Sequence, residues 1–235
     1  MIKSNVLDKG FIEVVDSLGN DLTVVNSARV SFGKRKKYWD KSDARLVRYL
    51  AKHKHYSPFR HLQVQFHIKA PEFVMRQWYK HVVGIETTSN GSTKDHAWNE
   101  ISGRYVPVEE YYIPEIWRKQ SDDNKQASEG ELGDEQNSRA IHYYNTALTT
   151  TINMYNRLIN DLGVAKEQAR VILPLSQYTE VYWTASFQAI MNFIELRNEK
   201  TSQIEIQEYA KVMLEQMKEV FPKTTELWSE AHGWN

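Results

Sequence analysis

Two short polar stretches, residues 76–81 and 99–104, concentrate the side chains of this chain that could bind an anionic ligand. The first carries two cations, Arg76 and Lys80, one helical turn apart. The second has a Ser-Gly pair between a carboxylate and Arg104. Backbone N–H groups, a hydroxyl and an arginine suit a phosphate. A solvated helix face and an ordinary turn with an ion pair are the alternatives. The candidates are Arg76, Gln77, Lys80, His81, Asn99, Glu100, Ser102 and Arg104.

Two further arginines, Arg170 and Arg197, lie in segments that are mainly apolar. A guanidinium in such surroundings needs an anionic partner or a ligand, because an unpaired charge is costly to remove from water. A structural ion pair, for instance with Glu195 or Glu205, would serve equally well. The sequence therefore makes both arginines candidates for ligand binding and leaves the structural alternative open.

Three histidines, His53, His55 and His61, lie close together in the sequence and could bind zinc. No carboxylate accompanies them, and the chain has no His-Glu-x-x-His motif. A metal-dependent hydrolase built on these histidines is the alternative function from another class of enzyme, and we expect no metal.

Composition excludes several other classes of protein. At 235 residues and 41% hydrophobic side chains, the chain is long enough for one domain with a substantial core. Lysine and arginine total 30, as do aspartate and glutamate, so no basic stripe predicts a nucleic-acid partner. No apolar run could span a membrane, and the first residues lack a signal-peptide core, so we expect a cytoplasmic protein. The absence of cysteine excludes disulfides, thiolate metal sites and a cysteine nucleophile.

Hydrophobic periodicity indicates which elements position these residues in the first half of the chain. Alternation predicts strands over 10–16 and 62–70, the second with one polar face. A turn at Leu18-Gly19-Asn20-Asp21 leads into a helix over 22–30. Ser42 or Asp43 can cap a second helix, and Pro71 begins a third, which carries Arg76, Gln77 and Lys80.

Two polar segments, 84–97 and 118–137, predict mobile loops within the single domain. The rest of the chain has helical periodicity, broken at Gly163, Pro174 and Pro222. Strands and mixed segments followed by helices favour an α+β fold with a helical C-terminal half. The helices are expected at 138–161, 165–173, 179–198, 203–220 and 223–231.

Short stretches in a fixed order along nearly the whole chain point to one family. They are Leu-Asp-Lys-Gly-Phe (7–11), Gly-Asn-Asp-Leu (19–22), Ala-Arg-Val-Ser-Phe (28–32), Ser-Pro-Phe-x-His (57–61), Arg-Gln-Trp (76–78), Asn-Glu-x-Ser-Gly-Arg-Tyr (99–105), Ala-Arg-x-x-Leu-Pro (169–174), Tyr-Thr (178–179), Met-Asn-Phe (191–193) and Leu-Arg (196–197). Each is weak alone, but the ordered set is highly specific. Taken together, the chain resembles the flavin-dependent thymidylate synthases.

The resemblance implies an enzyme that methylates dUMP at C5 to give dTMP. Methylenetetrahydrofolate would supply the carbon, FAD would carry reducing equivalents, and NADPH would reduce the flavin. It also implies a central, mostly antiparallel sheet and a homotetramer whose sites form between subunits. The lack of cysteine agrees, because the unrelated cysteine-dependent enzymes attack uracil C6 with a thiolate.

The resemblance also implies a role for particular residues. Arg197 would lie at the uracil edge as the catalytic residue, where a fixed cation favours ionisation at N3. The dUMP site would contain Gln77, Lys80, Glu100, Ile101, Ser102, Gly103, Arg104, Arg170 and Arg197, with the backbone around Trp78 and Tyr79. The FAD site would contain Ser31, Ser57, Lys80, His81, Val82, Glu100, Ser186, Gln188 and Asn192.

The chain departs from the family pattern mainly on the flavin side. The family signature is Arg-His-Arg, seven residues and then Ser, whereas this chain has Lys80-His81-Val82 and a longer interval before Ser102. Many members have Asn and Arg at the positions of Ser186 and Gln188, and a histidine near the position of Thr201. Lysine keeps the charge of arginine but not its bidentate fork. A dUMP-binding relative with altered chemistry, such as hydroxymethylation, or with impaired flavin use is therefore the alternative within the family.

Overall fold

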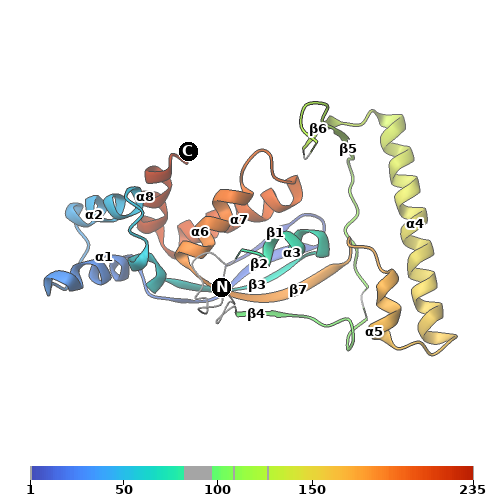
Figure 1. The fold of residues 1–235 in the computed structure, drawn as a ribbon, viewed down its shortest axis with the longest axis horizontal. Coiled ribbons are helices and arrows are strands. Elements are labelled where there is room, and N and C mark those ends of the chain that lie inside the picture. The colour runs from blue at the N-terminus through green and yellow to red at the C-terminus, as the bar shows by residue number, and fades with distance from the viewer. Residues whose placement is uncertain (1, 82–96, 108, 126, 235) are drawn as a thin grey trace.

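A five-stranded antiparallel sheet forms the centre of the protein, as seen in a computed structural model that describes residues 2–81, 97–107, 109–125 and 127–234. Every neighbouring pair of strands in this sheet is antiparallel, which confirms the expected sheet (Figure 1). The spatial order is β1 (Ile2–Val6), β2 (Gly10–Leu18), β3 (Gln63–Pro71), β7 (Tyr178–Ser186) and β4 (Ala97–Glu100).

The central strand β3 forms because apolar and polar side chains alternate along it. Val64, Phe66 and Ile68 are fully buried, whereas Gln65 and His67 on the other face are partly exposed. The strands predicted over 10–16 and 62–70 are thus confirmed as β2 and β3. The sequence analysis did not predict the N-terminal strand β1.

Helices cover the buried face of the sheet, where α6 and α7 lie above the strands in Figure 1. Trp78, from α3, stacks on Phe193, from α6, with ring centroids 4.2 Å apart. No helix in the described ranges is long and apolar enough to cross a membrane. The helices around this core are α1 (Asp21–Arg29), α2 (Lys41–Lys52), α3 (Glu72–Trp78), α6 (Phe187–Arg197), α7 (Ile204–Val220) and α8 (Pro222–His232), with 3₁₀ turns η1 (Val30–Phe32) and η2 (Ser57–His61).

The first two helices are capped by side chains from the preceding residue. Asn20 caps α1 through a hydrogen bond from the backbone of Leu22, as the predicted turn requires. In α2 the cap is Asp40, not Ser42 or Asp43. Asp43 instead occupies the third helical position and accepts a hydrogen bond from the Asp40 backbone N–H, completing a capping box.

The helix predicted over 179–198 is wrong in its first half. Residues 178–186 form β7, and only Phe187–Arg197 are helical. Val181, Trp183 and Ala185 point into the core with the alternation of a strand. Branched and aromatic side chains favour a pleated surface, and pairing with β3 along its whole length outweighs the helical pattern.

The polar segment 118–137 has regular structure where a mobile loop was expected. It forms a hairpin of β5 (Arg118–Gln120) and β6 (Ser128–Glu131) before α4 (Asp134–Asn160) begins. Its mobility stays a prediction, and the predicted loop at 84–97 lies outside the described residues except Ala97.

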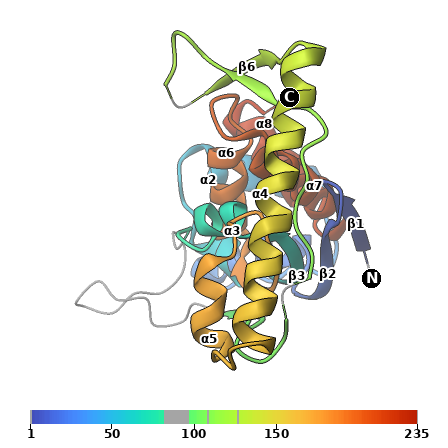
Figure 2. The ribbon, with the colours of Figure 1, turned by 90° about the vertical axis from the view of Figure 1, so that its right-hand side faces the viewer.

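The long helix α4 stands at the end of the sheet, away from α1 and α2, with α5 (Lys166–Ala169) beside it (Figures 1 and 2). The helix predicted over 165–173 is shorter than expected. After Ala169 the chain continues as the 3₁₀ turn η3 (Arg170–Ile172), which ends just before Pro174.

Candidate active site

A cavity of about 750 Å³ lies where β4, η3 and the start of β7 meet. Its size suits a nucleotide. Among its lining residues are Glu100, Ile101, Ser102, Gly103, Arg104 and Arg170. Two segments that are about 66 residues apart in sequence are thereby brought to one place, as the resemblance implied.

Strand pairing fixes the wall of this cavity that carries Glu100. The Ile101 N–H donates to the carbonyl of Glu180 at 2.9 Å, which continues the β4–β7 ladder past the end of β4. The Thr179 hydroxyl donates to Oε1 of Glu100 at 2.8 Å. Glu100 is therefore held in place by β7 before any ligand arrives.

Besides the carboxylates of Glu72, Glu100 and Glu167, the cavity is lined by the cations Arg104 and Arg170. Both are exposed, and neither forms an ion pair with a carboxylate in the part of the chain that the structure describes. Arg104 Nε donates to the hydroxyl of Ser102 at 3.2 Å, so hydroxyl and guanidinium lie side by side. Arg170 does interact electrostatically with Glu72, but no direct ion pair occupies its guanidinium among the described residues, so a ligand anion can bind there.

Two lining residues of the cavity, Glu72 and Tyr178, were missed as site candidates. Burial, and then the charge of Glu100, raise the pKa of Glu72. Tyr178 is buried, and its hydroxyl donates to Oδ1 of Asp8 at 2.5 Å. Burial and this hydrogen bond raise the pKa of Tyr178. Tyr178 belongs to the matched stretch 178–179 and its partner Asp8 to the stretch 7–11, and this was the sequence signal that could have identified Tyr178.

A second polar group consists of Arg197, the last residue of α6, and His81, which follows α3 by three residues. Arg197 Nε donates to Nε2 of His81 at 2.8 Å. Burial, and then the adjacent guanidinium, lower the pKa of His81 to about 4. The imidazole is therefore neutral at neutral pH. Neither alternative partner pairs with Arg197, since Glu205 binds Arg118 at 2.8 Å and Glu195 forms no ion pair among the described residues.

The side chains of Gln77 and Trp78 do not line the cavity. The Gln77 side chain donates to Oε1 of Gln203 at 2.7 Å. The backbone carbonyl oxygen of Gln77 accepts from Nη2 of Arg197 at 3.5 Å. The Trp78 ring is fully buried in the core, so only its backbone can line a site, whereas Tyr79 and Lys80 are exposed. The cavity lining includes neither Gln77 nor Arg197.

The remaining flavin candidates lie in two further places. Ser57 is on η2, Ser186 ends β7, and Gln188 and Asn192 are on α6, which contacts η2. Ser186 caps α6 by accepting a hydrogen bond from the Ala189 N–H. Val82 lies outside the described residues.

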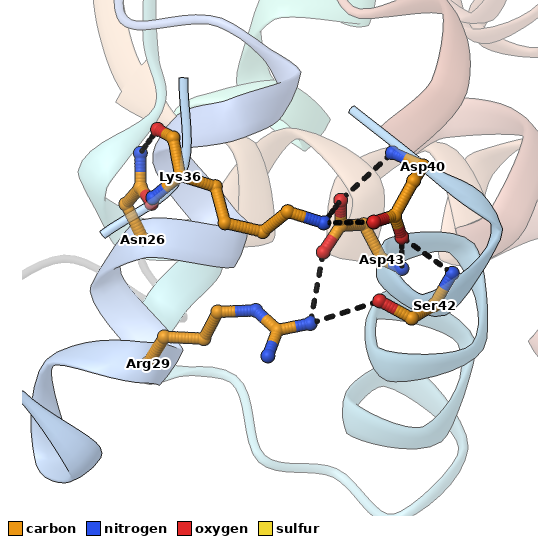
Figure 3. Close-up of polar contacts among 6 residues, drawn as sticks. All are labelled: Asn26, Arg29, Lys36, Asp40, Ser42 and Asp43. Carbon is orange, nitrogen blue, oxygen red and sulfur yellow. Dashed lines mark hydrogen bonds and ion pairs between the residues drawn. The ribbon is translucent and has the colours of Figure 1, made fainter. Parts of the chain in front are cut away.

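Ser31 lies on η1, at the start of a segment that a charge cluster fixes to α2 (Figure 3). Asp43 is fully buried at the centre of this cluster. It accepts hydrogen bonds from Nη2 of Arg29 at 2.9 Å and from Nζ of Lys36 at 2.6 Å. Asn26 also exchanges two hydrogen bonds with the backbone of Lys36. These contacts tie Arg29 and Lys36 to α2 and the backbone of Lys36 to α1.

The histidines of the metal hypothesis do not form a metal site. His53 and His55 lie against the ring of Tyr49, with centroids 4.3 and 6.0 Å away. Within the described ranges, which include His61, no group of three or more His, Asp or Glu side chains could hold a metal ion.

Comparison with known proteins gives a family that agrees with this geometry. The family model described as "Thymidylate synthase complementing protein" matches residues 13–223. The flavin-dependent thymidylate synthase of Thermus thermophilus is 42% identical over 92% of this chain and 74% of its own length. That of Thermosipho africanus is 40% identical over 94% of this chain and 91% of its own length. The chain belongs to the flavin-dependent thymidylate synthase family.

A solved structure extends the likeness to the whole fold of this thymidylate synthase. The UMP/dUMP methylase PolB from Streptomyces cacaoi, bound with 5-Br dUMP, has a TM-score of 0.81 and 28% sequence identity, and the match covers 97% of each chain. Family membership makes the protein an enzyme, a methyltransferase that depends on a flavin. It also disfavours the His-cluster hydrolase, which neither the family nor the geometry supports.

Proposed function

We propose that this thymidylate synthase converts dUMP to dTMP at the cavity lined by Ser102, Gly103, Arg104 and Arg170, with methylenetetrahydrofolate as carbon donor and NADPH as reductant of FAD. The observation that carries the proposal is a pair of arginines with no direct ion pair among the described residues, beside the partly exposed Ser102-Gly103 turn, in a cavity large enough for a nucleotide. The solved relative bound with 5-Br dUMP supports the same substrate class.

In this proposal the cavity residues bind and orient the nucleotide. Arg104 and the Ser102 hydroxyl, already 3.2 Å apart at Nε and Oγ, receive the phosphate. Arg170 faces the same space from η3. Glu100, held by Thr179, accepts a hydrogen bond from a neutral part of the nucleotide. These contacts position the uracil ring and contribute no covalent chemistry.

Arg197 would act on the ring itself by stabilising negative charge at the uracil edge as N3 ionises. Its partner His81 is neutral, because burial and the adjacent guanidinium lower the pKa of the imidazole to about 4. His81 therefore fixes Arg197 Nε at 2.8 Å without cancelling its charge. A carboxylate in the same place would neutralise the guanidinium and weaken its effect on the ring.

FAD, when bound, supplies the reducing equivalents for the methylation. The donors on this chain fit an anionic dinucleotide, because the exposed Lys80 forms no ion pair with a carboxylate in the described part of the chain. Ser57 and Ser31 add exposed hydroxyls. We propose that the FAD site comprises these residues with His81, Val82, Glu100, Ser186, Gln188 and Asn192.

We further propose that the enzyme is a homotetramer whose active sites form between subunits. The cavity and the Arg197–His81 group both belong to the proposed dUMP site, yet the cavity lining contains neither of these two residues. A neighbouring copy that brings its own Arg197 to the cavity would join them. Folate and NADPH would then reach a site shared by more than one chain.

The test is the visible absorbance spectrum of the purified protein after incubation with FAD and desalting, with and without dUMP. A retained flavin band that dUMP perturbs would place both ligands in one site. Absence of flavin under both conditions would contradict the proposal and move the function to the altered-chemistry alternative. Product mass in the complete reaction then separates dTMP from a hydroxymethylated nucleotide.

A further inference from the structure

Arg60 is on η2, where this turn contacts α6. The sequence patterns did not single out this residue. Its Nε donates to Oε1 of Gln188 at 2.6 Å. Gln188 is only 4% exposed, whereas Arg60 is exposed. No carboxylate among the described residues forms an ion pair with Arg60. A buried amide therefore fixes one edge of the guanidinium, and the positive charge stays unneutralised at the surface.

The Arg60–Gln188 contact also gathers the residues expected to face FAD. Side chains three apart on a 3₁₀ turn share one side, which places Ser57 with Arg60. Side chains one turn apart on an α-helix share one face, which places Gln188 with Asn192. The hydrogen bond joins these two sides, and η2 and α6 are in contact around it. Arg60 thus places a cation among three residues that are expected to contact FAD.

We propose that Arg60 binds the diphosphate of FAD; this inference rests on the proposed function. The guanidinium is planar, and the hydrogen bond at Nε fixes its orientation, so its two terminal nitrogens form a fork that matches two phosphate oxygens. Arg60 would then supply a cation on the flavin side of the site, where Gln188 itself has none.

A purely structural role for Arg60 makes a different prediction. If the guanidinium served only to satisfy the buried amide of Gln188, its removal would weaken the fold and affect all flavins alike. Binding to a phosphate instead predicts a loss that is selective for flavins that carry phosphate and that diminishes at high salt. Ligand selectivity therefore separates the two roles.

The experiment titrates FAD and riboflavin into the full-length chain freed of flavin, and follows quenching of flavin fluorescence. Arg60→Gln should raise the Kd for FAD about 10- to 100-fold, the range expected for a lost charged hydrogen bond. Riboflavin, which has no phosphate, should bind as it does to the wild type. The salt dependence of the FAD Kd should also become shallower in the variant.

Three further variants sharpen the test. Arg45→Gln removes the same charge from an exposed position on α2 and should leave the FAD Kd unchanged. The double variant Arg60→Gln with Gln188→Arg moves the guanidinium to the other side of the same contact and should restore part of the FAD affinity. Arg60→Lys, which keeps the charge but loses the fork, should bind FAD with intermediate affinity.

Three outcomes would overturn the inference. An unchanged FAD Kd and salt dependence in Arg60→Gln would show that Arg60 takes no part in binding. An equal loss for FAD and riboflavin would assign Arg60 to the structure of the site. If the wild-type chain itself bound no FAD while retaining its fold, the proposed function would fail, and the role of Arg60 would fail with it.

Discussion

Around Asp43, cations and carboxylates neutralise one another inside the fold, whereas around the cavity Arg104 and Arg170 have no carboxylate partner in the described residues. Asp43 is fully buried between Arg29 and Lys36 and also accepts a backbone N–H (Figure 3). In the first group the charges hold a segment to a helix. In the second they remain available to a ligand. Whether a charged side chain has a direct ion-pair partner therefore distinguishes structural from ligand-binding charges better than residue type does.

The largest effect should come from Arg197. Like the charges of the cavity arginines, its charge remains available to a ligand, because its partner His81 is neutral. Arg197→Ala should lower kcat by about 100- to 1,000-fold, the usual cost of removing one group that stabilises developing charge. The dUMP Kd should change less, because the interaction strengthens as the ring ionises. Steady-state kinetics and a dUMP titration measure the two quantities. Weakened binding with intact turnover would contradict this role.

Next in size is the effect of the cavity arginines on substrate binding. Arg104→Ala and Arg170→Ala should each weaken dUMP binding by about 1.5–3 kcal/mol, the value of a lost charged hydrogen bond. Isothermal titration of dUMP into each variant measures the loss. Arg45→Ala, at an exposed position on α2, is the matched control. Unchanged binding in both cavity variants would remove the distinction between the two groups of charges.

Asp43→Asn should have the opposite profile, with loss of stability and little loss of dUMP affinity. Removing one member of a buried pair leaves its partners uncompensated, but Arg29 and Lys36 retain some access to solvent. We therefore expect about 2 kcal/mol less free energy of unfolding, below the range for fully buried pairs. Urea denaturation at pH 7 measures it. A dUMP defect without destabilisation would show that this group also acts in binding.

The contribution of Asp43 should also depend on pH. Burial alone would raise the pKa of Asp43, but hydrogen bonds from Lys36, the Asp40 backbone and Arg29 outweigh it and lower the pKa. Because the folded pKa lies below the unfolded value of about 3.9, the stabilisation is complete above that pH and is lost as pH falls through the folded pKa. The stability difference between wild type and Asp43→Asn should therefore be constant above about pH 5 and shrink below about pH 4.

Local patterns predicted the fold where one face of an element is buried and the other is not. The alternation of β3 and the helical period of α7 and α8 correspond to their observed bounds within a few residues. Residues 178–186 were misassigned because both neighbours of β7 are distant in sequence, so its pairing is invisible locally. The hairpin at 118–131 has few apolar side chains, and hydrophobic periodicity could not reveal it.

The candidate site shows the same division between local and distant information. Matched stretches gave Ser102, Arg104 and Arg170, which the structure brings to one cavity. Glu72 and Arg60 were missed, since their neighbours Gln177 and Gln188 come from more than 100 residues away. The role of such a charged residue depends on neighbours that are distant in sequence, and only the fold shows which neighbours these are.

The smallest effect should come from the histidines that could have formed a metal site. In His55→Ala, turnover should be unchanged and stability should change by no more than about 0.5 kcal/mol, because the side chain is exposed and only borders the ring of Tyr49. Metal analysis of the wild type should show no stoichiometric zinc. Activity lost in the folded variant and restored by added metal would revive the hydrolase alternative. The arginines of the cavity would then no longer be sufficient to identify the chemistry.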